Sequence, residues 1–244
     1  MAVQTNRSGI LWPPHYILVR SRLGLYGYAV SRTASLIEES LATIEAAIND
    51  YPTLSMPTGL NLSGLVMLDL AANVGFSGKV IFVDTGYHFP ETIELWKSLQ
   101  QRYDHPQFVT IDNVRGHDEM YLLNPEACCE ARKVDPLANY LATEGVDAIL
   151  TGRTRHQSSS RPDLPLVEYG SRVHVNSVAD WTRDDLERYA VDHSIERHQL
   201  YDLGFLSIGC WPCTRAVQPG EDERSGRFVG QGRTECGLWT KGRL

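Results

Sequence analysis

Short apolar runs with strand character alternate along this chain with longer stretches of helical spacing. The clearest run, residues 79–84 (KVIFVD), is rich in β-branched residues and is typical of a buried parallel strand. The apolar spacing around it predicts helices over 35–50, 64–74, 126–143 and 182–193, and a further helix that starts near residue 91. It also predicts strands over 107–111 and 148–151 and a hairpin over 166–175. Strands that alternate with helices imply right-handed crossovers, so an α/β fold with a mostly parallel twisted sheet flanked by helices is expected.

Local signals mark where two of these helices begin. Ser35 and Glu38 have the spacing of a capping box, which predicts a helix start at residue 35. Thr182 is placed to cap the last regular helix.

The 244 residues are enough for one sizeable core, and their pattern divides the chain into three parts. Residues 1–33 have no clear periodicity and are predicted to form an arm or a partner-contacting segment. Residues 34–217 carry the strands and helices of one α/β domain. Residues 218–244 are rich in glycine and charge and lack apolar spacing, which is typical of a mobile tail.

Charge and hydropathy argue against several classes of protein. A net charge of −7 at pH 7 disfavours a general nucleic-acid binder. No apolar run approaches the roughly 18 residues of a membrane-spanning helix, so no membrane partner is expected. Because the charged and apolar segments of a secretory signal are missing, we expect a cytoplasmic location with reduced thiols. The sequence leaves the oligomeric state open, a homo-oligomer included.

The cysteines are the strongest chemical signal. Cys128 and Cys129 are adjacent, Cys210 and Cys213 form a Cys-x-x-Cys pair, and Cys236 stands alone near the end of the chain. Adjacent Cα atoms lie about 3.8 Å apart, short of the roughly 4.4–6.8 Å that a disulfide prefers. The four paired thiols therefore predict a metal site, with iron–sulfur favoured over structural zinc. The fifth is either a spare surface thiol or a reactive one.

Cationic side chains gather near these cysteines and near the ends of the expected strands. Lys133 follows the cysteine pair, Arg153 and Arg155 follow the strand at 148–151, and Arg224 and Arg227 lie in the tail. Guanidinium groups bind phosphate and sulfate oxygens in bidentate fashion. In an acidic protein this crowding indicates a local anion site.

Two turns lie where a sheet of this kind binds ligands. Asp84 follows the strand at 79–84, where its carboxylate could bind a ribose hydroxyl, and Gly152 follows the strand at 148–151. Ser63 and Gly64 open a helix whose backbone amides could hold a phosphate.

Taken together, these segments resemble the assimilatory sulfonucleotide reductases, and most of all their iron–sulfur form, adenosine 5′-phosphosulfate (APS) reductase. The resemblance spans roughly residues 35–239 and rests on six motifs in the right order: 84–92 (DTGYHFPET), 128–137 (CCEARKVDPL), 152–158 (GRTRHQS), 207–217 (SIGCWPCTRAV), 220–227 (GEDERSGR) and 234–238 (TECGL).

The resemblance implies a Rossmann-like fold of the adenine nucleotide alpha-hydrolase, or pyrophosphatase-loop, type. It implies one [4Fe–4S] cluster per chain on the four paired cysteines and a catalytic role for Cys236. The implied substrate-binding residues are Ser63, Asp84, Lys133, Gly152, Arg153, Arg155, Arg224 and Arg227. The implied reaction reduces APS to sulfite and AMP through an S-sulfocysteine on Cys236, with thioredoxin or glutaredoxin as partner, in sulfate assimilation and cysteine biosynthesis.

Three positions depart from the pattern of that family. Asn61 stands where a glycine is usual, Arg233 replaces a lysine, and Trp239 replaces a histidine. Three alternatives remain: a reductase for the 3′-phosphorylated substrate (PAPS), an ATP-pyrophosphatase-type sulfur-inserting enzyme, and a zinc or redox-sensor protein.

Overall fold

The computed structural model describes residues 24–112, 116, 118–157, 161–233 and 237–240. Contacts divide the chain into two units, residues 1–35 and residues 36–244. Within the first unit, the described residues 24–35 are helical. No helix among the described residues is long and apolar enough to cross a membrane.

The elements follow one another in βα order. The strands are β1 (Ser55–Thr58), β2 (Lys79–Asp84), β3 (Gln107–Asp112), β4 (Ala148–Leu150), β5 (Val167–Glu168) and β6 (Val173–Val175). The α-helices are α1 (Gly24–Asp50), α2 (Leu62–Asn73), α3 (Pro90–Arg102), α4 (Met120–Leu123), α5 (Pro125–Cys129), α6 (Asp135–Thr143), α7 (Arg183–Asp192) and α8 (Gly237–Thr240). Shorter turns are the π-helical η2 (Glu130–Val134) and the 3₁₀-helical η3 (Arg155–Gln157), η4 (Gln199–Leu203) and η5 (Trp211–Cys213).

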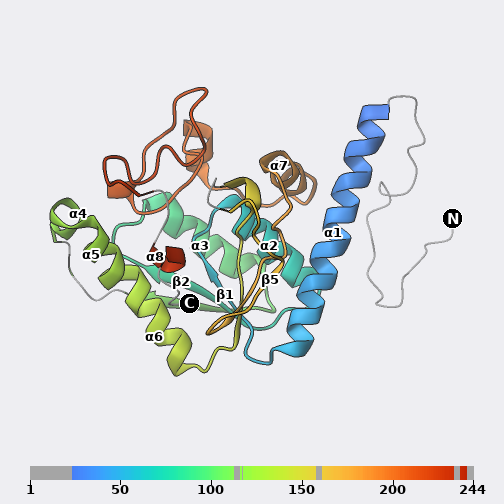
Figure 1. Ribbon diagram of the computed structural model, residues 1–244, viewed down its shortest axis with the longest axis horizontal. Helices are drawn as coiled ribbons and strands as arrows, with labels where there is room; N and C mark the ends of the chain where they lie inside the picture. The colour runs from blue at the N-terminus through green and yellow to red at the C-terminus, as the bar shows by residue number, and fades with distance from the viewer. Residues whose placement is uncertain (1–23, 113–115, 117, 158–160, 234–236, 241–244) are drawn as a thin grey trace. The chain divides into compact units, whose positions relative to one another are not determined.

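The strands form one sheet in the order β3-β2-β1-β4-β6-β5. Figure 1 labels its strands β1, β2 and β5. All neighbours pair in parallel except β5, which runs antiparallel to β6. The β2–β3 register is continuous from Lys79–Gln107 to Asp84–Asp112. The carboxyl ends of β1, β2 and β4 therefore meet at one edge of the sheet, where ligands of such folds bind.

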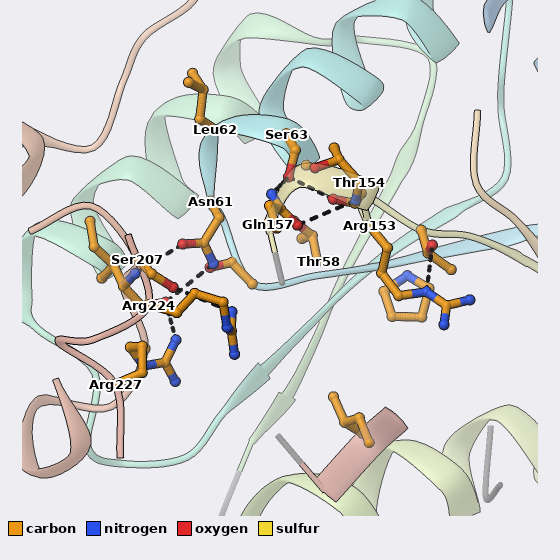
Figure 2. A pocket seen from close by; sticks show the side chains of 18 of the residues that line it. Thr58, Asn61, Leu62, Ser63, Arg153, Thr154, Gln157, Ser207, Arg224 and Arg227 are labelled. Atoms are coloured by element: carbon orange, nitrogen blue, oxygen red, sulfur yellow. Dashed lines mark hydrogen bonds between the residues drawn. The ribbon is translucent and has the colours of Figure 1, made fainter. Parts of the chain in front are cut away.

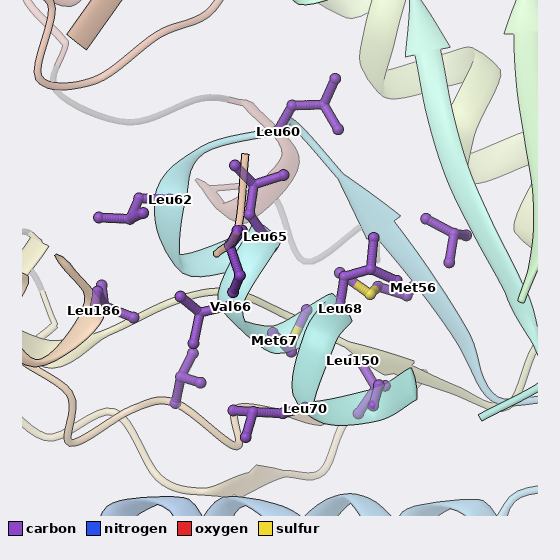
Figure 3. Packing of buried hydrophobic residues seen from close by; sticks show 14 of the residues in the cluster. Met56, Leu60, Leu62, Leu65, Val66, Met67, Leu68, Leu70, Leu150 and Leu186 are labelled. Atoms are coloured by element: carbon purple, nitrogen blue, oxygen red, sulfur yellow. The ribbon is translucent and has the colours of Figure 1, made fainter. Parts of the chain in front are cut away.

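Alternating side chains of β2 divide the core into two layers. Val80 and Phe82 belong to a cluster that includes α2, α3, α7 and the second half of α1, while Ile81 and Val83 pack with η2, α6 and α8. The sheet is thus covered on both faces, as a parallel sheet requires. Figure 3 shows α2 packed in the first layer, where its residues lie near Met56 of β1 and Leu150 of β4.

The structure confirms the α/β fold and most of the predicted elements. β2 has the predicted bounds, the hairpin over 166–175 is the β5–β6 pair, and α7 begins after Thr182 in a capping box with Asp185. β1 was not predicted, because it has only four residues and contains Pro57, which disfavours strands. β1 pairs with β4 only at Ser55, so the missing N–H group of Pro57 removes no hydrogen bond between β1 and β4.

Two predictions about helices need correction. The helix start at Ser35 is wrong, because α1 already begins at Gly24 and Ser35 lies inside it. A Ser-x-x-Glu pattern is also compatible with a helix interior, and the predicted arm accordingly includes ten helical residues, 24–33. The single helix over 126–143 is instead α5, η2 and α6 in succession, with a π-helical turn directly after Cys129.

The segment that was expected to be a tail is packed over its described part. Phe228 is only 4% exposed, and Arg227 pairs with Thr214 in an isolated bridge. Two ion-pair contacts join Arg215 to Glu221. Part of residues 218–233 therefore contacts the domain, while the mobility predicted for residues 218–244 stays a prediction.

A buried carboxylate ties α2 to α3 and α7, and its removal is expected to destabilise the fold. Asp69 accepts hydrogen bonds from the hydroxyls of Tyr103 at 2.8 Å and Tyr189 at 3.0 Å. Burial and the charge of Asp69 raise the pKa of both phenols, so both stay protonated donors. Asp69→Ala should lower the free energy of unfolding by about 3 kcal/mol, since two buried hydroxyls lose their acceptor. Urea denaturation measures the loss; an equal effect from the exposed Asp104→Ala control would contradict it.

Candidate functional site

A cavity opens at the carboxyl ends of β1, β2 and β4, and we call it the strand-end cavity. Its walls come from loop 58–64, residues 81–83 of β2, residues 151–154 after β4, and loop 206–209. Six of the eight predicted substrate-binding residues line it: Ser63, Lys133, Gly152, Arg153, Arg224 and Arg227. Asp84 and Arg155 do not.

The amino end of α2 forms one side of this cavity. Ser63 donates from its hydroxyl to the carbonyl of Gly152 at 2.6 Å and accepts from the Gln157 side chain at 2.8 Å. A Cβ atom at residue 152 would lie 2.8 Å from the amide nitrogen of Gly64, so a glycine there keeps the helix end open. An exposed amino end of an α-helix is suited to bind an anion.

Arginine side chains form the opposite side, as Figure 2 shows. Arg227 donates to the carbonyl of Ile208 at 3.2 Å, and Arg224 lies 3.5 Å from the hydroxyl of Ser207. A Cβ atom at residue 209 would lie 2.3 Å from Nη2 of Arg227, so this arginine packs where only a glycine fits. The amino end of α2 and the two arginines thus line one cavity.

Three predicted substrate-binding residues have partners within the protein. The Asp84 carboxylate accepts from the backbone N–H of Gly86 at 2.8 Å, which makes it a turn-forming group. Arg155 donates to the carbonyl of Leu164 at 2.8 Å and pairs with Asp180. Arg153 lines the cavity but pairs with Glu168. Neither Asp84 nor Arg155 lines the strand-end cavity, and their roles in substrate binding stay predictions.

His88 adds a neutral group to the same cavity. Burial and the charge of Lys133 lower the pKa of His88 to about 4, so the ring is uncharged near neutral pH. Its Nε2 lies 3.0 Å from the carbonyl of Val83, and the buried Nδ1 has no hydrogen-bond partner among the described residues. A neutral ring that donates through Nε2 leaves Nδ1 as an acceptor.

The four paired cysteines line a second cavity, which we call the cysteine cavity. Cys128, Cys129, Cys210 and Cys213 come to it from α5 and from the ends of η5. Cys210 Sγ lies 3.2 Å from the Thr85 hydroxyl, and the Gln231 side chain donates to Cys213 Sγ at 3.4 Å. Burial raises the pKa of Cys128 and of Cys210. Among the described residues, no three Cys, His, Asp or Glu side chains meet closely enough to hold a single metal ion.

Two neighbouring cations on η2 both line the cysteine cavity, but they differ in their other contacts. Arg132 is buried, donates to the Thr85 carbonyl at 3.1 Å and pairs with Asp118 at 2.8 Å, below the ring of Tyr87. Lys133 lines both the strand-end cavity and the cysteine cavity, as does Arg227. The two cavities are therefore neighbours that share cationic walls.

Cys236 lies outside the described residues. Leu238, which follows closely in the chain, is buried in the layer formed with Val134 and Leu137 and lines the strand-end cavity.

Sequence reasoning did not single out several residues that shape the cavity. Tyr201 accepts the backbone N–H of Leu62 at 2.8 Å. Arg183 donates to the carbonyl of Leu206 at 3.0 Å and stacks over the Tyr201 ring. The contact between Tyr201 and Leu62 joins residues 139 positions apart in sequence, and no local pattern could have indicated it. Gln157 lies within the noted motif 152–158, two residues after Arg155, and membership of that motif was its only signal.

Comparison with known proteins places the chain in a family. Residues 53–216 match the phosphoadenosine phosphosulfate reductase domain. A protein of Deinococcus radiodurans named adenosine 5′-phosphosulfate reductase is 52% identical over 203 residues, covering 80% of this chain and 80% of that one. A protein of the same name from Chelativorans sp. is 37% identical over 212 residues, covering 82% and 86%. The chain therefore belongs to the phosphoadenosine phosphosulfate reductase family.

Solved structures show the same fold. A PAPS reductase from Candida auris, in a phosphate complex, has a TM-score of 0.65 at 24% identity and covers 82% of this chain and 99% of that chain. An FMN adenylyltransferase from Candida glabrata has a TM-score of 0.63 at 14% identity, covering 82% and 70%.

Proposed function

We propose that this protein reduces APS to sulfite and AMP, as a step of sulfate assimilation that leads to cysteine. The supporting observation is the shared wall of the two cavities: Lys133 and Arg227 border both the strand-end cavity and the cysteine cavity. A nucleotide bound at the strand ends would thus present its phosphosulfate between cations, beside the cysteines. The names of the two bacterial relatives support the choice of APS.

In this proposal the open end of α2 receives the α-phosphate, through the backbone amides of Ser63 and Gly64. Lys133, Arg224 and Arg227 bind the oxygens of the phosphosulfate. Asp84 and Arg155 are given no substrate contact, because other groups of the protein hold both of them.

Cys128, Cys129, Cys210 and Cys213 would hold one [4Fe–4S] cluster. Their arrangement fits such a group: the four thiols border one cavity but do not converge on a single ion, whereas a cluster offers a separate iron to each thiolate. When bound, the cluster would order this region and contribute to its electric field. Its electrons are not required, because sulfate to sulfite is a two-electron change that a dithiol delivers as a unit.

The chemistry is carried by Cys236 in two displacements. The thiolate of Cys236 attacks the sulfate sulfur; an S–S bond forms, the S–O bond breaks, and AMP leaves with the electron pair of that bond. A dithiol of the thioredoxin or glutaredoxin type then attacks Sγ of Cys236. Sulfite leaves with the S–S electrons, the dithiol becomes a disulfide, and the thiol of Cys236 is restored. Free thiols of this kind persist in a reducing cytosol.

The cations make the first displacement feasible. A thiolate that approaches the anionic oxygens of a sulfate meets a repulsion of up to about 4 kcal/mol per charge contact at 4 Å, for an effective dielectric constant of 20. Lys133, Arg224 and Arg227 would offset it and stabilise the charge that develops on AMP.

The proposal is tested by supplying APS, PAPS or ATP to the purified protein, together with reduced thioredoxin. We expect sulfite and AMP from APS at a kcat/KM well above that for PAPS. Preferential release of sulfite from PAPS would instead make this a PAPS reductase. Pyrophosphate release from ATP without sulfite would identify a sulfur-inserting enzyme, and the absence of any turnover would contradict an enzymatic role.

A further inference from the structure

We propose that Asn61 is a positioning residue that sets the distance between the anion-binding end of α2 and the arginines on the other side of the strand-end cavity. The proposal rests on the function proposed above, and it concerns the one position of loop 58–64 that departs from the glycine of the family pattern. Asn61 occupies the N-cap position of α2 but makes no capping hydrogen bond with its side chain.

The side chain of Asn61 is directed across the cavity instead, to loop 206–209. Its Oδ1 accepts the backbone N–H of Ile208 at 2.9 Å, and its Nδ2 donates to the Ile208 carbonyl at 3.2 Å. The amide thus binds both polar groups of one residue that lies 147 positions away in sequence. Figure 2 shows Asn61 next to Ser207, Arg224 and Arg227.

This choice of partner keeps the end of α2 open for a ligand. An asparagine at the N-cap usually accepts a hydrogen bond from the second or third N–H of the helix, here Ser63 or Gly64. Because the Asn61 side chain is engaged with Ile208, the cap residue does not occupy those N–H groups. The first N–H of the helix, of Leu62, is already bound by the Tyr201 hydroxyl at 2.8 Å.

The same contact fixes the arginines and the cysteine loop. The Ile208 carbonyl also accepts from Arg227 at 3.2 Å, so Asn61 and Arg227 are bound to one oxygen. The hydroxyl of Ser207, the residue before Ile208, lies 3.5 Å from Arg224, and Cys210 lies two residues after Ile208. Arg183 holds the preceding carbonyl, of Leu206, at 3.0 Å. Loss of the Asn61 amide would free Ile208 from loop 58–64 while leaving it bound to Arg227.

The test compares the binding of AMP and of APS by calorimetry, in a Cys236→Ser background that prevents turnover. Asn61→Ala should weaken APS binding about tenfold and change AMP binding less than about threefold, because AMP lacks the sulfate that the arginines hold. With Cys236 intact, kcat/KM for APS should fall about 10- to 100-fold, as expected for a misplaced binding group. Asn73→Ala is the matched control: it removes another asparagine of α2, bonded to Asp69, and should leave both affinities unchanged.

Asn61→Asp keeps the acceptor for the Ile208 N–H but loses the donor and adds a negative charge. It covers the case in which the alanine variant does not fold, and its readout is the exchange of the Ile208 amide, which should stay protected. Hydrogen exchange at the Ile208 amide gives a readout independent of substrate: its protection should fall in Asn61→Ala without ligand. Unchanged APS affinity, or an equal loss for AMP and APS, would overturn the positioning role. If the Cys236→Ser parent itself does not prefer APS to AMP, the proposed function fails instead, and the exchange measurement still decides whether Asn61 holds Ile208.

Discussion

Replacing Cys236 with serine is expected to abolish sulfite release from APS, with kcat reduced by more than about 10⁴-fold. In the proposed mechanism the thiolate is the nucleophile of the first displacement, and a serine hydroxyl is almost wholly protonated near neutral pH. A serine also could not be regenerated by attack of a dithiol, because no S–S bond would exist. Both displacements therefore depend on this one sulfur atom.

The serine variant should keep the properties that depend on the rest of the chain. We expect unchanged iron content and APS binding, since neither the four paired cysteines nor the cavity residues are altered. In the unmodified protein, APS without a dithiol should leave one SO₃ group on Cys236, detectable by mass spectrometry as an added mass on the peptide with that residue. Full turnover of the serine variant would remove Cys236 from the mechanism.

The sequence was informative about the fold wherever a signal was local. The β-branched run of β2 and the N-cap role of Thr182 were both predicted and are confirmed, because strand and cap propensities act within a few residues. β1 was missed, since four residues with a proline carry little strand signal. The π-helical turn after Cys129 was also missed, because no periodicity of 3.6 residues distinguishes one widened turn inside a helical stretch.

For the candidate site, the sequence indicated residue types better than residue partners. Lys133, Arg224 and Arg227 were predicted to face an anion, and they line the strand-end cavity. Arg155 was predicted on the same grounds, and Asp84 was predicted to bind a ribose hydroxyl. Neither lines the cavity: Arg155 pairs with Asp180, and Asp84 accepts from the N–H of Gly86. Charge and position in the chain do not reveal which arginine or carboxylate already has a partner. Asn61 was noticed only as a departure, because its partner Ile208 is far away in sequence.

Replacing Cys129 with alanine is expected to strip the protein of the proposed [4Fe–4S] cluster. A [4Fe–4S] group uses four thiolates, so iron should fall from about four atoms per chain to less than about one, together with the sulfide. Cys129 is the better choice for this test than Cys128, which is buried and whose truncation would also leave a cavity in the core. Cys129 is half-buried, and the variant should still fold cooperatively in urea.

Iron and sulfide analysis of the two variants, Cys129→Ala and Cys236→Ser, gives a matched pair. Only the first should lose its brown colour, because only the first removes a proposed ligand. Full iron content in Cys129→Ala would refute that ligand assignment, and a colourless zinc-containing parent protein would favour the structural zinc alternative.

Lys133 lies four residues after Cys129 and lines the cysteine cavity. Loss of the cluster should therefore also weaken APS binding, while AMP, which lacks the sulfate, should bind nearly as before.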